Sequence, residues 1–154
     1  MDHYRARVSA ESGRAGPAEF ERLRRQLLEY DIFPPAFLLH GRCPAGPIEA
    51  GTTIVQRVQA DGLIALEMAV RVTRAWDTEN AQVREAGFTY VTLQGHAERG
   101  VESFRVQLDH GSGSITLLID ARSRPGLWLT RLGFPVARLI QRTLTRAAVH
   151  RLSG

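Results

Sequence analysis

The sequence predicts an α+β domain in which a curved antiparallel sheet wraps around a long C-terminal helix, an arrangement called helix-grip. Three observations support this class. The stretch after Gly51 alternates apolar and polar residues between short turns. Asp61-Gly62 separates two such runs and is a strong hairpin signal. From Pro135 onward, apolar residues recur at helical spacing. We therefore expect about five or six antiparallel strands around that helix.

Length and composition indicate one globular domain. The chain has 154 residues, of which 44% are hydrophobic and 23% charged, which is ordinary for a folded protein. We expect a flexible segment or edge strand over 1–16 and a single helix-grip domain over 17–154. No apolar run is long enough to span a membrane, and the start lacks the apolar segment of a secretory signal. A cytoplasmic location is the resulting expectation.

The cysteine count and the charge distribution limit the kinds of site and partner that we expect. The single cysteine, Cys43, excludes an internal disulfide and a multi-cysteine metal site, and we interpret it as an inert thiol. All basic residues are arginines, and no acidic residue follows Asp120. The basic C-terminal third is a candidate surface for anionic partners. No nucleic-acid-binding motif accompanies it, so a solvated helix face is the preferred interpretation.

The expected elements follow from periodicity and turn residues. An amphipathic helix begins at Pro17 and ends by Asp31, before a pair of prolines. A short strand over 37–41 and an irregular connection to Gly51 follow. The remaining strands are expected over 52–59, 63–76, 83–94, 101–109 and 115–122, before the helix from Pro135.

The side chains on one face of the expected sheet predict a binding cavity. Along 63–76, the even-numbered residues from Ile64 to Val72 are apolar, and Leu66, Met68 and Val70 lie among them. The helix presents Val136, Leu139 and Ile140 as an apolar stripe, while Arg138, Arg142 and Arg146 point away. We expect a small apolar or amphipathic molecule to bind between the two.

Polar residues are expected at one end of that cavity. Arg74 and Trp76 continue the even-numbered face, beside Phe88 and Tyr90 of the next strand, and an arginine there would grip a carboxylate or phosphate. A strand end that leaves the core, with Arg74 in solvent, is the alternative interpretation. The expected ligand-binding residues are Arg74, Tyr90, His96, Glu98, Glu102, Met68 and Leu139.

His96, Glu98 and Glu102 form the densest polar group, in and after one turn. A histidine beside a carboxylate suits acid–base catalysis near neutral pH, so all three are catalytic candidates. The same residue types also suit a divalent metal, but a turn does not hold ligands rigidly, and we expect no metal site. The alternative is a structural role, in which these residues form hydrogen bonds and ion pairs around the turn.

Two stretches resemble a known family. GFTYVTLQGHAERGVESF is similar to the diagnostic stretch of the DUF 1990 family (also UPF 0548, a domain of unknown function). The matching residues are Phe88, Tyr90, Thr92, Leu93, Gly95, His96, Glu98, Gly100, Glu102 and Phe104. SRPGLWLTRLGFPVARLIQR resembles the C-terminal stretch of that family. Val91 replaces a glycine of the family pattern, and Val101 replaces the first of two glutamates.

The resemblance implies a fold more than a reaction, because the family has no established activity. We infer from the element order a relation to the START-like (SRPBCC) ligand-binding superfamily. The preferred function is binding of the small molecule described above, without a cofactor. The alternatives are a hydrolase or cyclase that uses His96 as base with Glu98 or Glu102, and an interaction module that uses the basic helix. Ligand identity and oligomeric state are left open.

Overall fold

The fold is described from a computed structural model of the chain. The structure describes residues 2–8, 16–33, 35, 38–60, 63–96 and 98–125, and the side chains of 16–33, 35, 39–57, 67–96 and 99–122. The elements in chain order are β1 (Asp2–Val8), α1 (Pro17–Leu28), β2 (Leu38–Cys43), β3 (Thr53–Ala60), β4 (Leu63–Glu79), β5 (Val83–Thr92), β6 (Glu98–Asp109) and β7 (Ile115–Pro125).

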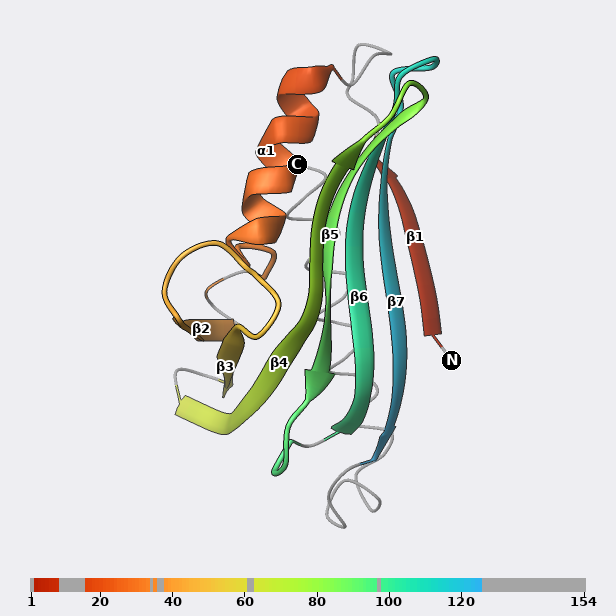
Figure 1. The fold of residues 1–154 in the computed structure, drawn as a ribbon. Coiled ribbons are helices and arrows are strands. Elements are labelled where there is room, and N and C mark those ends of the chain that lie inside the picture. Colours follow the sequence, from red (N-terminus) through yellow and green to blue (C-terminus); the bar gives the residue numbers. More distant parts are fainter. Residues whose placement is uncertain are drawn as a thin grey trace.

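The described strands form one antiparallel sheet in the order β1-β7-β6-β5-β4-β3-β2 (Figure 1). From β2 to β7 each strand pairs with the next one in the sequence, as short connections favour. β3 and β4 pair up to Ala60 and Leu63, so the Asp61-Gly62 signal correctly predicts a hairpin. β1 adds to the far edge, against β7.

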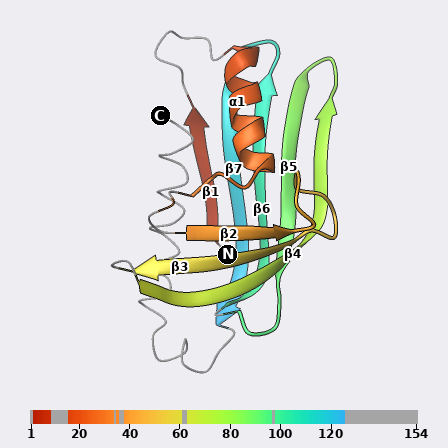
Figure 2. The same cartoon turned by 90° about the vertical axis from the view of Figure 1, so that its left-hand side faces the viewer.

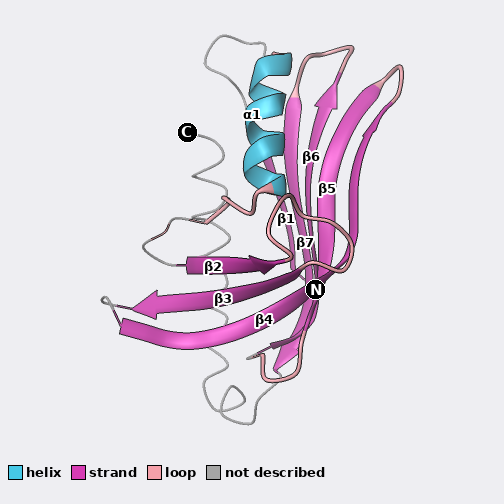
Figure 3. Ribbon diagram, turned by 60° about the vertical axis from the view of Figure 1, so that its left-hand side comes forward, coloured by secondary structure: helices cyan, strands magenta, loops and turns pink. Residues whose placement is uncertain are grey.

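The sheet is strongly curved. β2, β3 and the first part of β4 run across the direction of β5, β6 and β7 (Figures 2 and 3). β4 makes this change of direction: residues 63–71 pair with β3 and residues 70–79 with β5. The register with β5 shifts between Val72 and Arg74, which marks a bulge where the pairing changes over. Bulges bend a strand and increase its twist, so this one contributes to the curvature.

The described helix that covers the concave face is α1. Pro17 fits the first turn, where its missing N–H is not needed. The negative charge of Glu19, also in the first turn, interacts favourably with the positive end of the helix dipole. Phe20, Leu23 and Leu27 form one stripe and are fully buried. They pack over β5 and β6, and each buried side chain of this kind stabilises the fold by roughly 1.5–3 kcal/mol.

The prediction of a sheet wrapped around a long C-terminal helix is wrong. In the part of the chain that the structure describes, the sheet packs against the short N-terminal helix α1 instead. The physical reason is that α1 already supplies an apolar stripe that the concave face can bury. The stretch after Pro135, with Val136, Leu139 and Ile140, lies outside the described residues.

Ion pairs fix α1 against the sheet edge. The Arg24 guanidinium bonds the Asp77 carboxylate of β4 at 2.5 Å, and Arg84 of β5 bonds Glu21 at 2.6 Å. Arg84 also lies over the Phe20 ring, 5.1 Å from its centre. Because these groups are partly exposed, each pair contributes only about 0.2–1 kcal/mol. Their main effect is to fix the position of α1 along β4 and β5.

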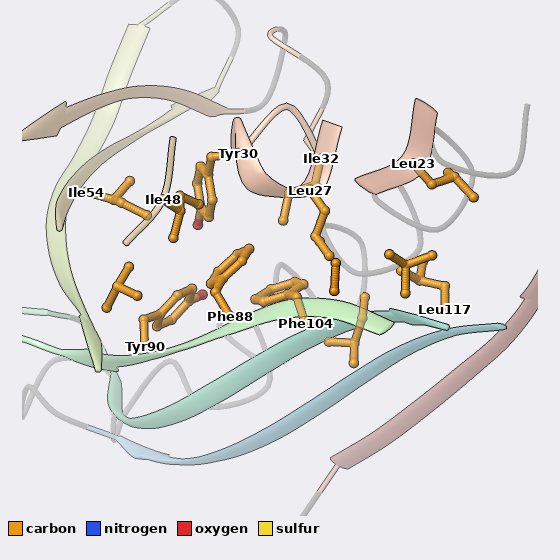
Figure 4. Close-up of a cluster of buried hydrophobic side chains, with 14 of the residues drawn as sticks. Leu23, Leu27, Tyr30, Ile32, Ile48, Ile54, Phe88, Tyr90, Phe104 and Leu117 are labelled. Carbon is orange, nitrogen blue, oxygen red and sulfur yellow. The ribbon is translucent and has the colours of Figure 1, made fainter. Parts of the chain in front are cut away.

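Aromatic side chains fill the core between α1 and the sheet (Figure 4). Phe88 of β5 and Phe104 of β6 are cross-strand partners whose rings stack at 5.2 Å. Tyr90 stacks on Phe88 at 6.2 Å, and Phe33 meets Phe104 edge-on at 6.3 Å. Such pairs each add about 0.5–1.5 kcal/mol beyond the burial of their area.

Among the described residues, no helix has the length and apolar character that a membrane span requires.

Candidate functional site

Four polar side chains meet inside this aromatic core. Tyr30 follows α1, Gln56 lies on β3, Tyr90 on β5 and Glu102 on β6. We call them the tyrosine network. Only 1% of Tyr30, 6% of Gln56 and 5% of Tyr90 is exposed, whereas Glu102 is half-buried. The hydroxyls of Tyr30 and Tyr90 point toward each other from opposite sides of the core (Figure 4).

Strand pairing creates the first contact of the network. Tyr90 and Glu102 are directly opposite each other in the β5–β6 register, so their side chains share the concave face. The Tyr90 hydroxyl donates a hydrogen bond to the Glu102 carboxylate. A bond to an ionised acceptor is among the strong ones in proteins. The sheet itself therefore holds a phenol–carboxylate pair in place.

The second contact joins β3 to the residue after α1. The Gln56 amide donates a hydrogen bond to the Tyr30 hydroxyl. Burial raises the pKa of Tyr30 far above its ordinary value, and the Glu102 charge raises it further. Burial and then the Glu102 charge raise the pKa of Tyr90 in the same way. Both phenols are therefore neutral hydrogen-bond donors at physiological pH.

Tyr30 holds its place in a strained backbone conformation. Its φ of +60° lies in the left-handed region, where a bulky residue is an outlier. The cause is the end of α1: the Tyr30 N–H bonds the Leu27 carbonyl and the Asp31 N–H bonds the Gln26 carbonyl. These two bonds form a Schellman motif, in which glycine normally stands where Tyr30 stands. This strain costs roughly 1–3 kcal/mol and occurs at the residue whose phenol joins the network.

The network reaches the protein surface along β2. His40 is the register partner of Gln56, and its ring meets the Tyr30 ring edge-on at 5.1 Å. His40 is exposed, yet burial of part of the ring lowers its pKa, and the nearby Arg42 charge lowers it further. Arg42 partners Ile54 on the same face. The Arg42 atom Nη1 is buried without a hydrogen-bond partner in the described structure.

Arg74 and Trp76 do not share a face with Tyr90, contrary to the sequence-based expectation. Tyr90 pairs with Val72, but Arg74 pairs with Thr89, whose side chain lies on the opposite, convex face. The bulge after Val72 inserts one extra residue, and an insertion reverses the alternation of every residue that follows. A role for Arg74 at the polar end of a concave-face site is therefore not supported by the register.

Arg74 and Trp76 instead belong to a cluster on the convex face. The Arg74 guanidinium lies 5.0 Å from the Trp76 ring centre, and the indole N–H bonds Glu85 at 2.7 Å. Arg105 also pairs with Glu85, at 3.6 Å. The Trp76 ring lies against Gly87, its register partner, where a Cβ would come within 2.6 Å of the ring. The cluster covers bare backbone with an aromatic ring, which is a structural role.

The residues of the predicted His96–Glu98–Glu102 group lie in the β5–β6 turn and on β6. His96 lies in the β5–β6 turn, where its N–H bonds the Leu93 carbonyl, and Glu98 begins β6. Glu102 accepts a hydrogen bond from the Tyr90 hydroxyl. Within the described residues, no three His, Cys, Asp or Glu side chains are arranged to hold a metal ion. Catalysis by His96 with Glu98 or Glu102 stays a prediction.

The remaining expected ligand-binding residues are placed only in part. Met68 is half-buried on β4, opposite Gln56, and so lies on the concave face beside the network. Leu139 and the basic helix face lie outside the described residues. Val101, where the family pattern has a glutamate, is 44% exposed, and adjacent strand residues face opposite sides. A glutamate there would not have joined Glu102.

Sequence analysis missed four residues of this region: Tyr30, His40, Arg42 and Gln56. Gln56 left a signal, because it interrupts the apolar alternation Ile54-x-Gln56-x-Val58 on a buried face. Tyr30 continues the stripe of α1 and so looked like an ordinary core residue. His40 and Arg42 became visible only when the register of β2 with β3 was known.

The arrangement can recognise polar groups at the edge of an apolar surface. Neutral phenols donate hydrogen bonds, the Glu102 carboxylate accepts them, and the amide of Gln56 can do both. Met68, opposite Gln56, and Phe33, edge-on to Tyr30 and Phe104, are only partly buried and supply the adjoining apolar area. A site of this composition, apolar with a few convergent polar groups, is typical for binding a small molecule.

Comparison with known proteins identifies relatives whose function is not known. The family described as "Domain of unknown function (DUF1990)" matches residues 1–151. A UPF0548 protein of Arabidopsis thaliana is 31% identical over 105 residues, which are 67% of this chain and 50% of that protein. A UPF0548 protein of Dictyostelium discoideum is 28% identical over 102 residues, 62% of this chain and 47% of that protein. The chain thus spans about half the length of these relatives.

Proposed function

The chain belongs to the DUF1990 family, and we propose that it binds a small amphipathic molecule on the concave face of the sheet, at the tyrosine network. One observation carries the proposal: the Tyr90–Glu102 pair forms a charged hydrogen bond at the edge of an aromatic surface. Glu102 would accept a hydrogen bond from a hydroxyl or amine of the ligand. The apolar body would lie against Met68 and Phe33, which are partly exposed. The predicted START-like relation finds no support in the family match and adds nothing to this proposal.

Exposure and strain support the proposal. The middle of the network is buried, while Glu102 and His40 at its ends are accessible to solvent, so a ligand can reach polar groups without unfolding the core. The left-handed φ of Tyr30 is a cost that a purely structural helix end would avoid with glycine. Strain of this kind concentrates at binding and catalytic sites.

Native mass spectrometry of gently purified protein tests the proposal. We expect the unmodified protein to carry a small molecule, which extraction and fragmentation then identify. Glu102→Gln should reduce the bound fraction at least tenfold. Glu85→Gln, which removes the same charge from the convex face, should leave it unchanged. Bare protein that also gives no saturation-transfer NMR signal with 1-decanol would contradict the proposal.

A further inference from the structure

Arg42 differs from the other arginines of the described structure. It lies on β2, an edge strand, and its register partner Ile54 is fully buried on the concave face. Its Nη1 atom is buried and makes no hydrogen bond to any described residue. A guanidinium is charged at every pH that a protein experiences, so this buried donor belongs to a cation.

Elsewhere in the described chain, arginines that are partly buried have carboxylate partners. The pairs are Arg22 with Glu19, Arg24 with Asp77, Arg84 with Glu21 and Arg105 with Glu85. A buried N–H that lacks an acceptor is a net cost to the folded state, because it has lost its water and gained nothing. Such a group calls for an explanation, and a ligand that brings its own acceptor is one.

The surroundings of Arg42 indicate the charge that such an acceptor should carry. His40, two residues earlier on the same face, has its pKa lowered first by burial and then by the Arg42 charge. Asp31 acts in the opposite direction, but its effect on His40 is smaller. At His40, the Arg42 charge thus outweighs the effect of the Asp31 carboxylate. An oxyanion complements both this charge and the planar donor pattern of a guanidinium.

We propose that Arg42 binds an oxyanion, a carboxylate or a phosphate, of the molecule held at the tyrosine network. This inference rests on the proposed function and adds the class of the ligand: an apolar body with an acidic head group. His40 and Tyr30 connect the two ends of the region, since the His40 ring contacts the Tyr30 ring. The head group lies at β2, and the apolar body extends across the concave face toward Met68, which lies opposite Gln56.

Calorimetric titration of the full chain with three probes of equal alkyl length tests the inference. The probes are decanoate, decyl phosphate and the uncharged 1-decanol. We expect at least one of the two oxyanions to bind tenfold or more tightly than 1-decanol, and the better one identifies the head group. Arg42→Gln should reduce its affinity to that of 1-decanol. Arg71→Gln, an exposed arginine of β4, is the matched control and should keep the preference.

The possible results separate the two proposals. Equal binding of all three probes overturns the role of Arg42 and leaves the proposed function standing. An oxyanion preference that survives in Arg42→Gln overturns it as well. If no probe binds, the proposed function fails and the inference with it. Should Arg42→Gln not fold, the Arg42 Nε–H signal of the unmodified protein gives the answer: it shifts on addition of the preferred oxyanion, and an unmoved signal overturns the inference.

Discussion

At the scale of single residues, hydrogen bonding and burial together define the tyrosine network. Tyr90 and Glu102 meet because the register of two strands places them opposite each other. Tyr30 reaches them from the end of α1 only because it accepts a left-handed backbone conformation. Each of these polar groups would destabilise the folded state if it were alone in an apolar core. Their hydrogen bonds to one another remove much of that cost.

The Tyr90–Glu102 hydrogen bond can be measured by a double-mutant cycle. We expect Tyr90→Phe to lower the free energy of unfolding by about 1–2 kcal/mol, because the carboxylate loses a donor. Glu102→Gln should cost a similar amount, and the double variant less than the sum, with a coupling energy of about 1 kcal/mol or more. Urea unfolding of the four proteins gives these values. Strictly additive effects would show that the bond contributes nothing to stability.

Alkaline pH should destabilise the protein through its buried phenols. The pKa values of Tyr30 and Tyr90 are raised in the folded state, so both keep their protons there while the unfolded chain loses them above about pH 10. Stability is therefore fully present below about pH 10 and decreases at higher pH, by about 1.4 kcal/mol per pH unit for each phenol. Urea unfolding at several pH values between about 9 and 11.5 measures this slope.

The chain suits this experiment because it has no lysine that would titrate in the same range. The control is the double variant Tyr30→Phe/Tyr90→Phe, which should lose most of the slope. Tyr4, the third tyrosine, is present in both proteins, so its contribution to the slope cancels in the comparison. An equal slope in both proteins would mean that the two phenols ionise normally in the folded state.

At the scale of elements, the bulge in β4 decides which side chains can cooperate. Before the bulge, Val70 and Val72 face the core; after it, Arg74 and Trp76 face the opposite side. The same irregularity lies where β4 exchanges its pairing with β3 for its pairing with β5. A single inserted residue thereby bends the sheet and also separates the arginine from the tyrosine network.

Gly87 fixes the packing of the convex face. A Cβ at this position would lie 2.4 Å from the Phe104 carbonyl oxygen and 2.6 Å from the Trp76 ring. We therefore expect Gly87→Ala to destabilise the fold by about 2 kcal/mol or more, because backbone cannot yield as a flexible side chain can. Urea unfolding measures the loss. Near-ultraviolet circular dichroism should report the displacement of Trp76.

Gly41→Ala is the matched control, because Gly41 also lies in a strand but has nothing within 4 Å of an added Cβ. It should change stability by less than about 0.5 kcal/mol, as surface substitutions generally do. If both variants were equally stable, the close approach of Trp76 to Gly87 would not exist in solution.

Sequence patterns predicted elements better than they predicted how elements pack. The α1 stripe and the strands of the β3–β4 hairpin follow from local periodicity and turn residues, and the structure confirms them. The bulge left no signal, because Val72, Thr73 and Arg74 read as uninterrupted alternation. The choice of helix against the sheet was wrong, because periodicity shows that a segment is amphipathic but not which surface its apolar face covers.

The candidate site was predictable to a similar degree. Tyr90 and Glu102 were singled out from the sequence, and the structure brings them together. Tyr30, His40 and Arg42 come from segments that are distant along the chain and meet this region only through the tertiary fold. A strained φ and an unpartnered guanidinium atom are properties of the tertiary structure, so no sequence pattern reveals them.

At the scale of the whole molecule, the two faces of the curved sheet differ in kind. The concave face holds α1, the aromatic core and a polar network that reaches solvent at Glu102 and His40. The convex face in the described structure carries the Trp76 cluster, in which Glu85 accepts the indole hydrogen bond and pairs with Arg105. We therefore propose that a ligand binds on the concave face.

Chemical-shift mapping of the ¹⁵N-labelled chain tests this proposal. The chain is titrated with decanoate to about 1 mM, a concentration at which even weak binding is detected. We expect saturable shifts of the backbone signals around Gln56, Tyr90 and Glu102 and of His40 and Arg42. The convex-face signals of Trp76 and Arg105 should not move. Spectra that do not change, or shifts confined to the convex face, would contradict it.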